Sequence, residues 1–329
     1  MPKKKVDLIT SYTAADTIPL KMLLDMDLIK STQEGRVIPI HIQFLPTNKC
    51  NRNCTFCSCN ARDKELEINF TTAKKIIDKC KALGTKSVTI TGGGEPLLYP
   101  YINELISYYH TNGIKIGLVT NGILLHTIPE KTINKMIWCR ISNDDSRNCS
   151  AEYKQNLSRV VLANPAIDWA FSHVISEHPD YDEIGRAVIF ANTHNFTHVR
   201  LVSDLLIPEK VDIDKLKNYL KDKDIDDRLV IYQGRKEFCK GGDCYICYLK
   251  PLIGPDGKLY TCCGCQYSLD IPTRDLPQEL CLGDAEDIDN IIDKSNIPFD
   301  GSNCVRCYYM HYNHLLKAML CEIKHIEFV

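Results

Sequence analysis

Over the first two hundred positions of the chain, segments whose hydrophobic residues have the period of a strand are followed by segments whose hydrophobic residues have the period of a helix. Residues 37–45 (VIPIHIQFL) have the period of a strand, and residues 70–83 (FTTAKKIIDKCKAL) carry apolar side chains at helical spacing before Gly84. The same succession recurs, with further strands expected at 87–91, 114–120, 138–142, 169–175 and 198–202 and helices at 101–110, 131–136, 151–162 and 181–192. Six such alternations predict parallel βαβ units in an α/β fold, a wound sheet or a barrel.

The character of the sequence changes after residue 211. A charged helix (VDIDKLKNYLKDKD) leads into a region that is rich in cysteine. We therefore expect an N-terminal extension (1–36), a strand-and-helix domain (37–228) and a C-terminal domain (229–329). The C-terminal domain would hold ten of the seventeen cysteines: Cys239, Cys244, Cys247, Cys262, Cys263, Cys265, Cys281, Cys304, Cys307 and Cys321.

Composition narrows the class of protein. A formal net charge of −2 and short, scattered basic runs do not indicate a nucleic-acid partner. No apolar run approaches the roughly 20 residues of a membrane span, and the start MPKKKVDLITSY lacks the apolar segment of a signal peptide. We expect a cytoplasmic protein without membrane contact, in which clustered cysteines bind metal or take part in chemistry.

Two short motifs follow the first two predicted strands. Cys50, Cys54 and Cys57 lie in the loop CNRNCTFCSC, and residues 92–96 read GGGEP. In parallel α/β folds, function gathers at these C-terminal ends of the strands. Three thiolates could form a zinc site completed by Cys59, or hold a four-iron cluster with one iron open to a ligand. The loop alone leaves both choices open.

Together, the CxxxCxΦC loop with Phe56 at its aromatic position and the GGEP-like run resemble the radical SAM superfamily over residues 37–205. The resemblance implies a partial (β/α)6 TIM-like barrel. It also implies that Cys50, Cys54 and Cys57 hold a [4Fe–4S] cluster, whose open iron binds S-adenosylmethionine. An external electron donor such as flavodoxin or ferredoxin would reduce the cluster.

The resemblance also assigns residues to the nucleoside and methionyl parts of the cofactor. Gly93, Gly94 and Glu95 would lie near the methionyl amino group, and the backbone of Phe56 near the adenine. The fourth strand reads WCRISNDDS, which is similar to the RxSxD pattern of related enzymes. Ser142 would contact the ribose, with Asn143 and Asp144 as weaker alternatives.

The C-terminal cysteines are similar to those of the Twitch or shortened SPASM extension, a small β-hairpin and helix domain with an auxiliary iron–sulfur cluster. Residues 255–257 (PDG) would turn the hairpin. The expected ligands of one auxiliary [4Fe–4S] cluster are Cys247, Cys262, Cys304 and Cys307. Cys244 is a rival, and Cys281 could also replace one ligand. Position 313 is Asn313 where the full SPASM pattern has a further cysteine, so a second auxiliary cluster is not expected.

The resulting prediction is a radical SAM oxidoreductase or epimerase that abstracts a hydrogen atom from a peptide or a small, sugar-like or aminoglycoside-like molecule. The auxiliary cluster would accept an electron in an oxidation. Alternatively, Cys263 would return a hydrogen atom in an epimerisation, although tandem cysteines also occur without such a role. A zinc-binding scaffold without catalytic activity is the alternative from a different class.

Overall fold

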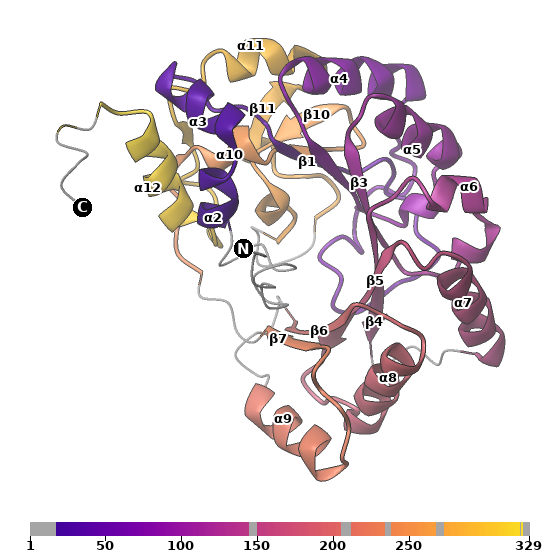
Figure 1. Cartoon of the computed structure of the whole chain (residues 1–329). Helices are drawn as coiled ribbons and strands as arrows, with labels where there is room; N and C mark the ends of the chain where they lie inside the picture. Colours follow the sequence, from indigo (N-terminus) through magenta and orange to yellow (C-terminus); the bar gives the residue numbers. More distant parts are fainter. Residues whose placement is uncertain are drawn as a thin grey trace, which may run out of the picture.

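The computed structural model describes residues 18–144, 150–204, 212–233, 238–267, 273–322 and 324. The expected succession of parallel strands is present (Figure 1). A seventh parallel strand follows residue 228 and pairs with the sixth, which the sequence pattern did not indicate. The strands are β1 (His41–Phe44), β2 (Ser87–Ile90), β3 (Lys115–Thr120), β4 (Trp138–Asp144), β5 (Asp168–Ile175), β6 (His198–Ser203) and β7 (Val230–Gln233), and they lie side by side in this order.

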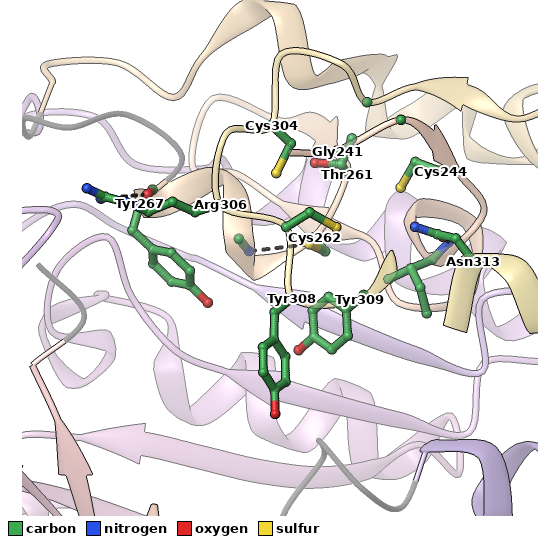
Figure 2. A pocket seen from close by; sticks show the side chains of 15 residues that line it. Gly241, Cys244, Thr261, Cys262, Tyr267, Cys304, Arg306, Tyr308, Tyr309 and Asn313 are labelled. Carbon is green, nitrogen blue, oxygen red and sulfur yellow. Dashed lines mark hydrogen bonds between the residues drawn. The ribbon is translucent and has the colours of Figure 1, made fainter. Parts of the chain in front are cut away.

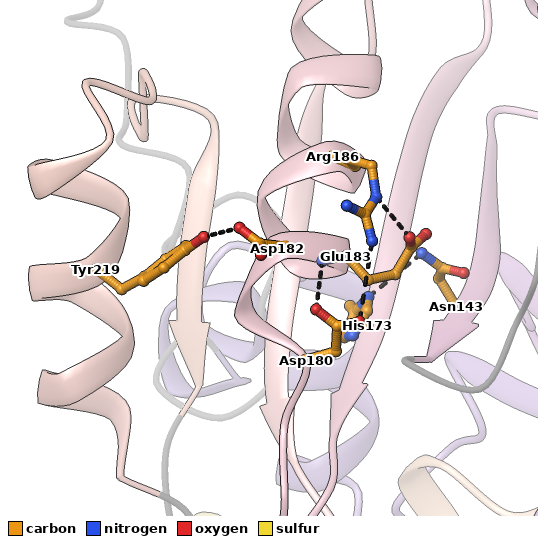
Figure 3. A network of polar contacts seen from close by, with 7 residues as sticks. All are labelled: Asn143, His173, Asp180, Asp182, Glu183, Arg186 and Tyr219. Carbon is orange, nitrogen blue, oxygen red and sulfur yellow. Dashed lines mark hydrogen bonds and ion pairs between the residues drawn. The ribbon is translucent and has the colours of Figure 1, made fainter.

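Helices between the strands cover the outer side of the curved sheet (Figure 1). Their N-termini begin where the sequence supplies a capping oxygen: Asn69 accepts from the Thr71 amide and Ser150 from the Tyr153 amide. At the far end of the sheet, Tyr219 donates a hydrogen bond to Asp182 (Figure 3). The helices are α4 (Phe70–Ala82), α5 (Ile102–Thr111), α6 (Glu130–Ile133), α7 (Ala151–Ala163), α8 (Tyr181–Thr193) and α9 (Ile213–Asp222).

Three of the C-terminal strands continue the same sheet, whereas β8 (Asp243–Cys244) and β12 (Phe299–Asp300) form a separate two-stranded sheet. Strand β9 (Leu252–Ile253) pairs in parallel with β1, and β10 (Lys258–Tyr260) and β11 (Cys281–Asp284) follow it. The hairpin turns at residues 255–257 as predicted, with Gly257 at a φ of +76° that favours glycine. The ten-stranded, mostly parallel sheet is the predicted α/β, partial TIM-like architecture.

The remaining elements gather beside the first strand. The N-terminal helices α2 (Ile18–Leu23) and α3 (Met26–Gln33) contact α12 (Met310–Met319) near the C-terminus (Figure 1). No helix among the described residues is long and apolar enough to cross a membrane. The other short elements are α10 (Ile246–Leu249), α11 (Ile288–Ile292), β8 (Asp243–Cys244), β12 (Phe299–Asp300), and the 3-10 turns η1 (Pro96–Leu98), η2 (Leu125–Thr127), η4 (Cys263–Tyr267), η5 (Gln278–Leu280) and η6 (Ala285–Asp287).

Candidate functional site

The glycine run after β2 lies directly against the segment that leads into the cysteine loop. The amide of Gly94 donates to the carbonyl of Thr47 (3.1 Å), and the amide of Glu95 donates to that of Lys49 (2.7 Å). A Cβ atom at Gly94 would lie 2.1 Å from the Lys49 carbonyl oxygen, and one at Gly93 would lie 1.9 Å from Asn48 Oδ1. Glycine is therefore required at position 94, because two backbone segments approach more closely there than a side chain allows, whereas a side chain at position 93 would displace that of Asn48.

The residues predicted to hold the cluster and S-adenosylmethionine line one cavity of about 170 Å³. Cys59 is buried and does not line this cavity; its thiol donates to Gln266 Oε1 (3.3 Å). Burial raises the pKa of the Cys50 thiol. The predicted residues on the cavity wall are Cys50, Cys54, Phe56, Cys57, Gly93, Gly94, Glu95 and Ser142.

The Glu95 carboxylate is fixed by the protein itself. It accepts hydrogen bonds from the Leu97 amide (3.1 Å), the Thr120 hydroxyl (2.5 Å) and the Asn121 amide (2.7 Å). The side chain of Asn121 in turn donates to Asn51 in the cysteine loop (2.7 Å). Glu95 thereby ties the ends of β2 and β3 together beneath the loop, a positioning role that the sequence motif did not reveal.

The two alternatives to Ser142 differ from it in placement. Asn143 is buried, directs its amide toward His173 (3.3 Å; Figure 3), and does not line the cavity. This follows from the alternation of side chains along β4, which places Ser142 and Arg140 on the opposite face from Asn143. The side chain of Asp144 lies outside the described residues.

A larger cavity of about 690 Å³ occupies the inside of the curved sheet. Thr91 and Val119 line both this lumen and the cysteine-loop cavity, so the two spaces adjoin. Gly117 leaves room for the ring of Trp138, which would lie 2.1 Å from a Cβ atom at that position. Alternate residues of the strands line the lumen, as in a barrel, among them His41, Thr89, Arg140, Ala170, His198 and Arg200.

The lumen is electrostatically positive. Burial, reinforced by Lys250 and Lys21, lowers the pKa of His41 to about 3. Burial with the neighbouring Arg140 and Arg200 lowers the pKa of His198 to about 3. Both imidazoles are therefore neutral at pH 7, because a further positive charge in this cavity is unfavourable.

A third, small cavity lies among the C-terminal cysteines, where Figure 2 shows the sulfur atoms of Cys244, Cys262 and Cys304 around the same space. Cys307 also lines it. Close backbone contacts hold these separate segments together: the amide of Gly241 donates to the Cys304 carbonyl (2.7 Å). Of the four predicted auxiliary ligands, Cys262, Cys304 and Cys307 thus lie on one cavity wall.

Cys247 occupies a different position from these three. It is fully buried in the hydrophobic core, does not line the cavity, and donates its thiol to the carbonyl of Cys244 (3.1 Å). Asn313 lines the cavity and accepts hydrogen bonds from the amides of Tyr245 and Ile246, both at 2.8 Å. The residue that replaces the expected SPASM cysteine therefore fixes the turn that carries Cys244. Cys281 lies on β11 and does not line this cavity.

Cys262 and Cys263 face different spaces. Cys263 lines the lumen, whereas Cys262 lines the auxiliary cavity. The sulfur of Cys263 lies 3.7 Å from the Tyr267 hydroxyl and 3.8 Å from the Tyr309 hydroxyl, both of which also line the lumen. The turn η4 is therefore the wall between the two cavities.

The donor sets fit iron–sulfur clusters in chemical identity, since thiolates are their usual ligands. In the part of the chain that the structure describes, all sixteen cysteines are free. No group of three or more His, Cys, Asp or Glu side chains there is arranged to hold a single metal ion. Cysteines of a four-iron cluster each bind a different iron, so a cluster does not require convergence on one point.

Comparison with known proteins supports the interpretation of the cysteine-loop cavity as a site for an iron–sulfur cluster and S-adenosylmethionine. Residues 44–137 match the model of the radical SAM superfamily. The chain is 37% identical over 75 residues to 7-carboxy-7-deazaguanine synthase of Clostridium acetobutylicum (22% of this chain, 34% of that protein). It is 38% identical over 88 residues to a probable GTP 3′,8-cyclase of Methanococcus maripaludis (26% and 29%). The chain thus spans about a third of the length of these relatives.

The fold extends the likeness beyond that domain. The structure of Streptococcus suis SuiB bound to the precursor peptide SuiA covers 74% of this chain and 64% of its own, with a TM-score of 0.54 and 17% identity. SuiB is a radical SAM enzyme of the SPASM/Twitch type, so the chain has the fold of a radical SAM domain joined to an auxiliary-cluster domain. A [4Fe–4S] cluster and S-adenosylmethionine are the cofactors of such a domain.

Proposed function

We propose, on the premise that residues 44–137 are a radical SAM domain, that this chain uses S-adenosylmethionine to abstract a hydrogen atom from a C–H bond of its substrate. The supporting observation is the single cavity that Cys50, Cys54 and Cys57 share with the glycine run. When bound and reduced by one electron, the cofactors supply a 5′-deoxyadenosyl radical. The electron comes from an external donor such as flavodoxin or ferredoxin.

Within this cavity the chain holds and orients the cofactors. Cys50, Cys54 and Cys57 bind three irons, and the segment 93–95, Phe56 and Ser142 surround S-adenosylmethionine. The protein places the substrate in the adjoining lumen, where Thr91 and Val119 form the shared boundary. A position inside the curved sheet would shield a reactive radical on the side of the strands.

For the auxiliary cluster we propose Cys244, Cys262, Cys304 and Cys307 as ligands. This assignment replaces Cys247, the choice that spacing favours, with Cys244, because Cys244 lines the cavity and Cys247 points its thiol at a backbone carbonyl. The auxiliary cluster would accept an electron if the reaction is an oxidation. The sixteen cysteines that the structure describes are all free, which suits a reducing compartment, and we propose that the protein acts in the cytoplasm.

The position of Cys263 on the lumen wall supports a second outcome, epimerisation. Its S–H bond would give a hydrogen atom to the substrate radical, leaving a thiyl radical that must be reduced by one electron and one proton, with the auxiliary cluster as the electron source. Both a peptide and a small molecule are candidate substrates. SuiB was crystallised with a peptide, whereas the name of the matched cyclase specifies a nucleotide.

Anaerobic reconstitution tests the proposal. We expect a brown protein that absorbs at about 400 nm and binds about eight irons per chain. Reduced protein should convert S-adenosylmethionine to 5′-deoxyadenosine, and replacing Cys50, Cys54 and Cys57 with alanine should abolish this conversion. A colourless protein that binds zinc at both cysteine groups would identify a scaffold instead.

Deuterium distinguishes the two outcomes of the reaction. In D2O, epimerisation through Cys263 should place one deuterium on the product carbon, and Cys263→Ala should stop incorporation while 5′-deoxyadenosine still forms. An oxidation should instead give a product that has lost two hydrogens and contains no solvent deuterium.

A further inference from the structure

Two arginines line the lumen, each from the third position of its strand. Arg140 on β4 pairs in register with Val119, which lies on the boundary with the cysteine-loop cavity. Arg200 on β6 is level with Ser142, because both residues pair with Ser172 on the strand between them. Both arginines line the lumen and neither lines the cysteine-loop cavity, so they lie on the substrate side of the boundary.

These two charges have no acidic partner in the described part of the chain. None of the ion pairs there includes Arg140 or Arg200. The Nε atoms of both are buried and lack a hydrogen-bond partner among the described residues. Arg140 stacks on the ring of Trp138, 5.1 Å from its centroid, and Arg200 donates to Gln233. Both contacts orient a guanidinium without neutralising it.

The burial of Arg140 and Arg200 lowers the pKa of both guanidinium groups. Burial and the neighbouring Arg200 lower the pKa of Arg140 well below its ordinary value, and burial lowers the pKa of Arg200 to about 10. An arginine guanidinium is not deprotonated in proteins, so both side chains are cationic at pH 7. Two like charges that are withdrawn from water in the same cavity destabilise the empty protein unless a ligand compensates them.

The rest of the lumen has the same sign. Its two carboxylates are already engaged: Asp25 pairs with Lys86 (2.7 Å), and Asp168 accepts from Thr197 (3.4 Å). The volume of about 690 Å³ is that of a site for a small molecule. The cationic side chains on the wall are Lys21, Lys86, Lys115, Arg140, Arg200 and Lys250.

We propose that the substrate is a small molecule that carries a phosphate group, bound in the lumen by Arg140 and Arg200. This inference deepens the proposed function and rests on it. Planar guanidinium groups match the oxygens of phosphate in pairs, and two of them balance its double negative charge. A cationic aminoglycoside, one of the substrates expected from the sequence, is disfavoured by the same charges.

Binding to the reconstituted, unreduced protein tests the inference at constant ionic strength. Calorimetry would compare ribose 5-phosphate with ribose, citrate and tobramycin, so that phosphate, a neutral sugar, a carboxylate and a polycation are each represented. We expect ribose 5-phosphate to bind at least tenfold more tightly than the other three. Arg140→Gln and Arg200→Gln should each weaken it at least tenfold, whereas Arg186→Gln on the exposed face of α8 should not change it.

Two further measurements test whether the arginines act on the phosphate ligand and not on S-adenosylmethionine or on folding alone. The affinity for S-adenosylmethionine should stay within about twofold in both variants, which excludes the arginines as ligands of the cofactor carboxylate. Without ligand, Arg200→Met should melt at a higher temperature than the wild type, because it removes an uncompensated charge. This variant should also lose the stabilisation that ribose 5-phosphate gives.

The inference fails if ribose 5-phosphate does not bind, if citrate or tobramycin binds better, or if the arginine variants bind it as the wild type does. These outcomes are independent of catalysis. Formation of 5′-deoxyadenosine by the wild type would still support the proposed function when the phosphate site is wrong. Absence of that product would reject the function even if the phosphate binds.

Discussion

Replacing Cys244 and Cys247 one at a time gives a decisive test of the auxiliary site. The two residues are three positions apart, yet only Cys244 lines the cavity. We expect Cys244→Ala to lose the auxiliary iron and to retain the first cluster, so that bound iron falls from about eight to about four per chain. Cys247→Ala should keep the full iron content.

Stability should rank the two variants in the reverse order: Cys247→Ala, which keeps its iron, should be the less stable of the two in the cluster-free state. Cys247 is fully buried, and alanine removes both its packing in the core and the hydrogen bond of its thiol to the Cys244 carbonyl (3.1 Å). One lost sulfur atom and one weak hydrogen bond cost about 1 to 2 kcal/mol. For a chain of 329 residues, that lowers the melting temperature by about 1 to 3 °C. Cys244 is only half-buried, so alanine there should change the melting of the cluster-free protein little.

Iron and sulfide are counted after anaerobic reconstitution, and melting is followed on cluster-free protein by circular dichroism. Cys262→Ala is the positive control, because Cys262 lines the cavity and is a ligand whether Cys244 or Cys247 completes the set. The reasoning is refuted if Cys247→Ala loses four irons while Cys244→Ala keeps them. Spacing along the chain would then have identified the ligand better than the shape of the cavity does.

Three other substitutions follow from the same structure. Gly241→Ala places a Cβ atom 2.3 Å from the Gly301 carbonyl oxygen and should lower auxiliary iron occupancy, whereas Gly242→Ala, whose nearest neighbour is 3.7 Å away, should keep the iron count of the wild type. Glu95→Gln turns an amide toward backbone and hydroxyl donors, which should cost about 1 to 3 kcal/mol in chemical denaturation and reduce 5′-deoxyadenosine formation. Asn313→Ala leaves two buried amides without their acceptor; it should cost about 2 kcal/mol or more and make the auxiliary iron easier to chelate, and unchanged chelation kinetics would contradict the role of Asn313.

The sequence predicted the fold well because local periodicity and parallel connections determine it. Strands β1 to β6 lie where alternation placed them, and the cysteine loop and the glycine run meet because both follow neighbouring strands. Strand β7 was missed since only four residues, 230–233, form it and no alternating pattern marks them. The pairing of β9 with β1 depends on a long-range contact that no local pattern encodes.

The sites were predictable to a smaller degree. Motif spacing identified which segments come together, but it could not decide between Cys244 and Cys247, because that choice depends on a turn fixed by Asn313 from a distant helix. The arginine pair was also overlooked, although the alternation along β4 already places Arg140 on the same face as Ser142. Its role depends on the folded sheet, which brings Arg200, two strands away on β6, into the same lumen, where no described carboxylate pairs with either charge.

The arrangement of the three cavities also constrains the chemistry. The cysteine-loop cavity adjoins the lumen across Thr91 and Val119, whereas Cys263 and Tyr309 reach the lumen from the C-terminal elements. If the proposed anchor holds the substrate in the lumen, the substrate would lose a hydrogen atom toward the cysteine-loop cavity and receive one from Cys263; inversion at carbon requires that these two transfers take place on opposite faces. Because the anchor fixes the substrate before the radical forms, the choice between oxidation and epimerisation then depends on how close the reacting carbon lies to Cys263. An anchored substrate also explains why the lumen should retain a destabilising pair of cations: their cost to the empty protein is offset on binding, when orientation matters most.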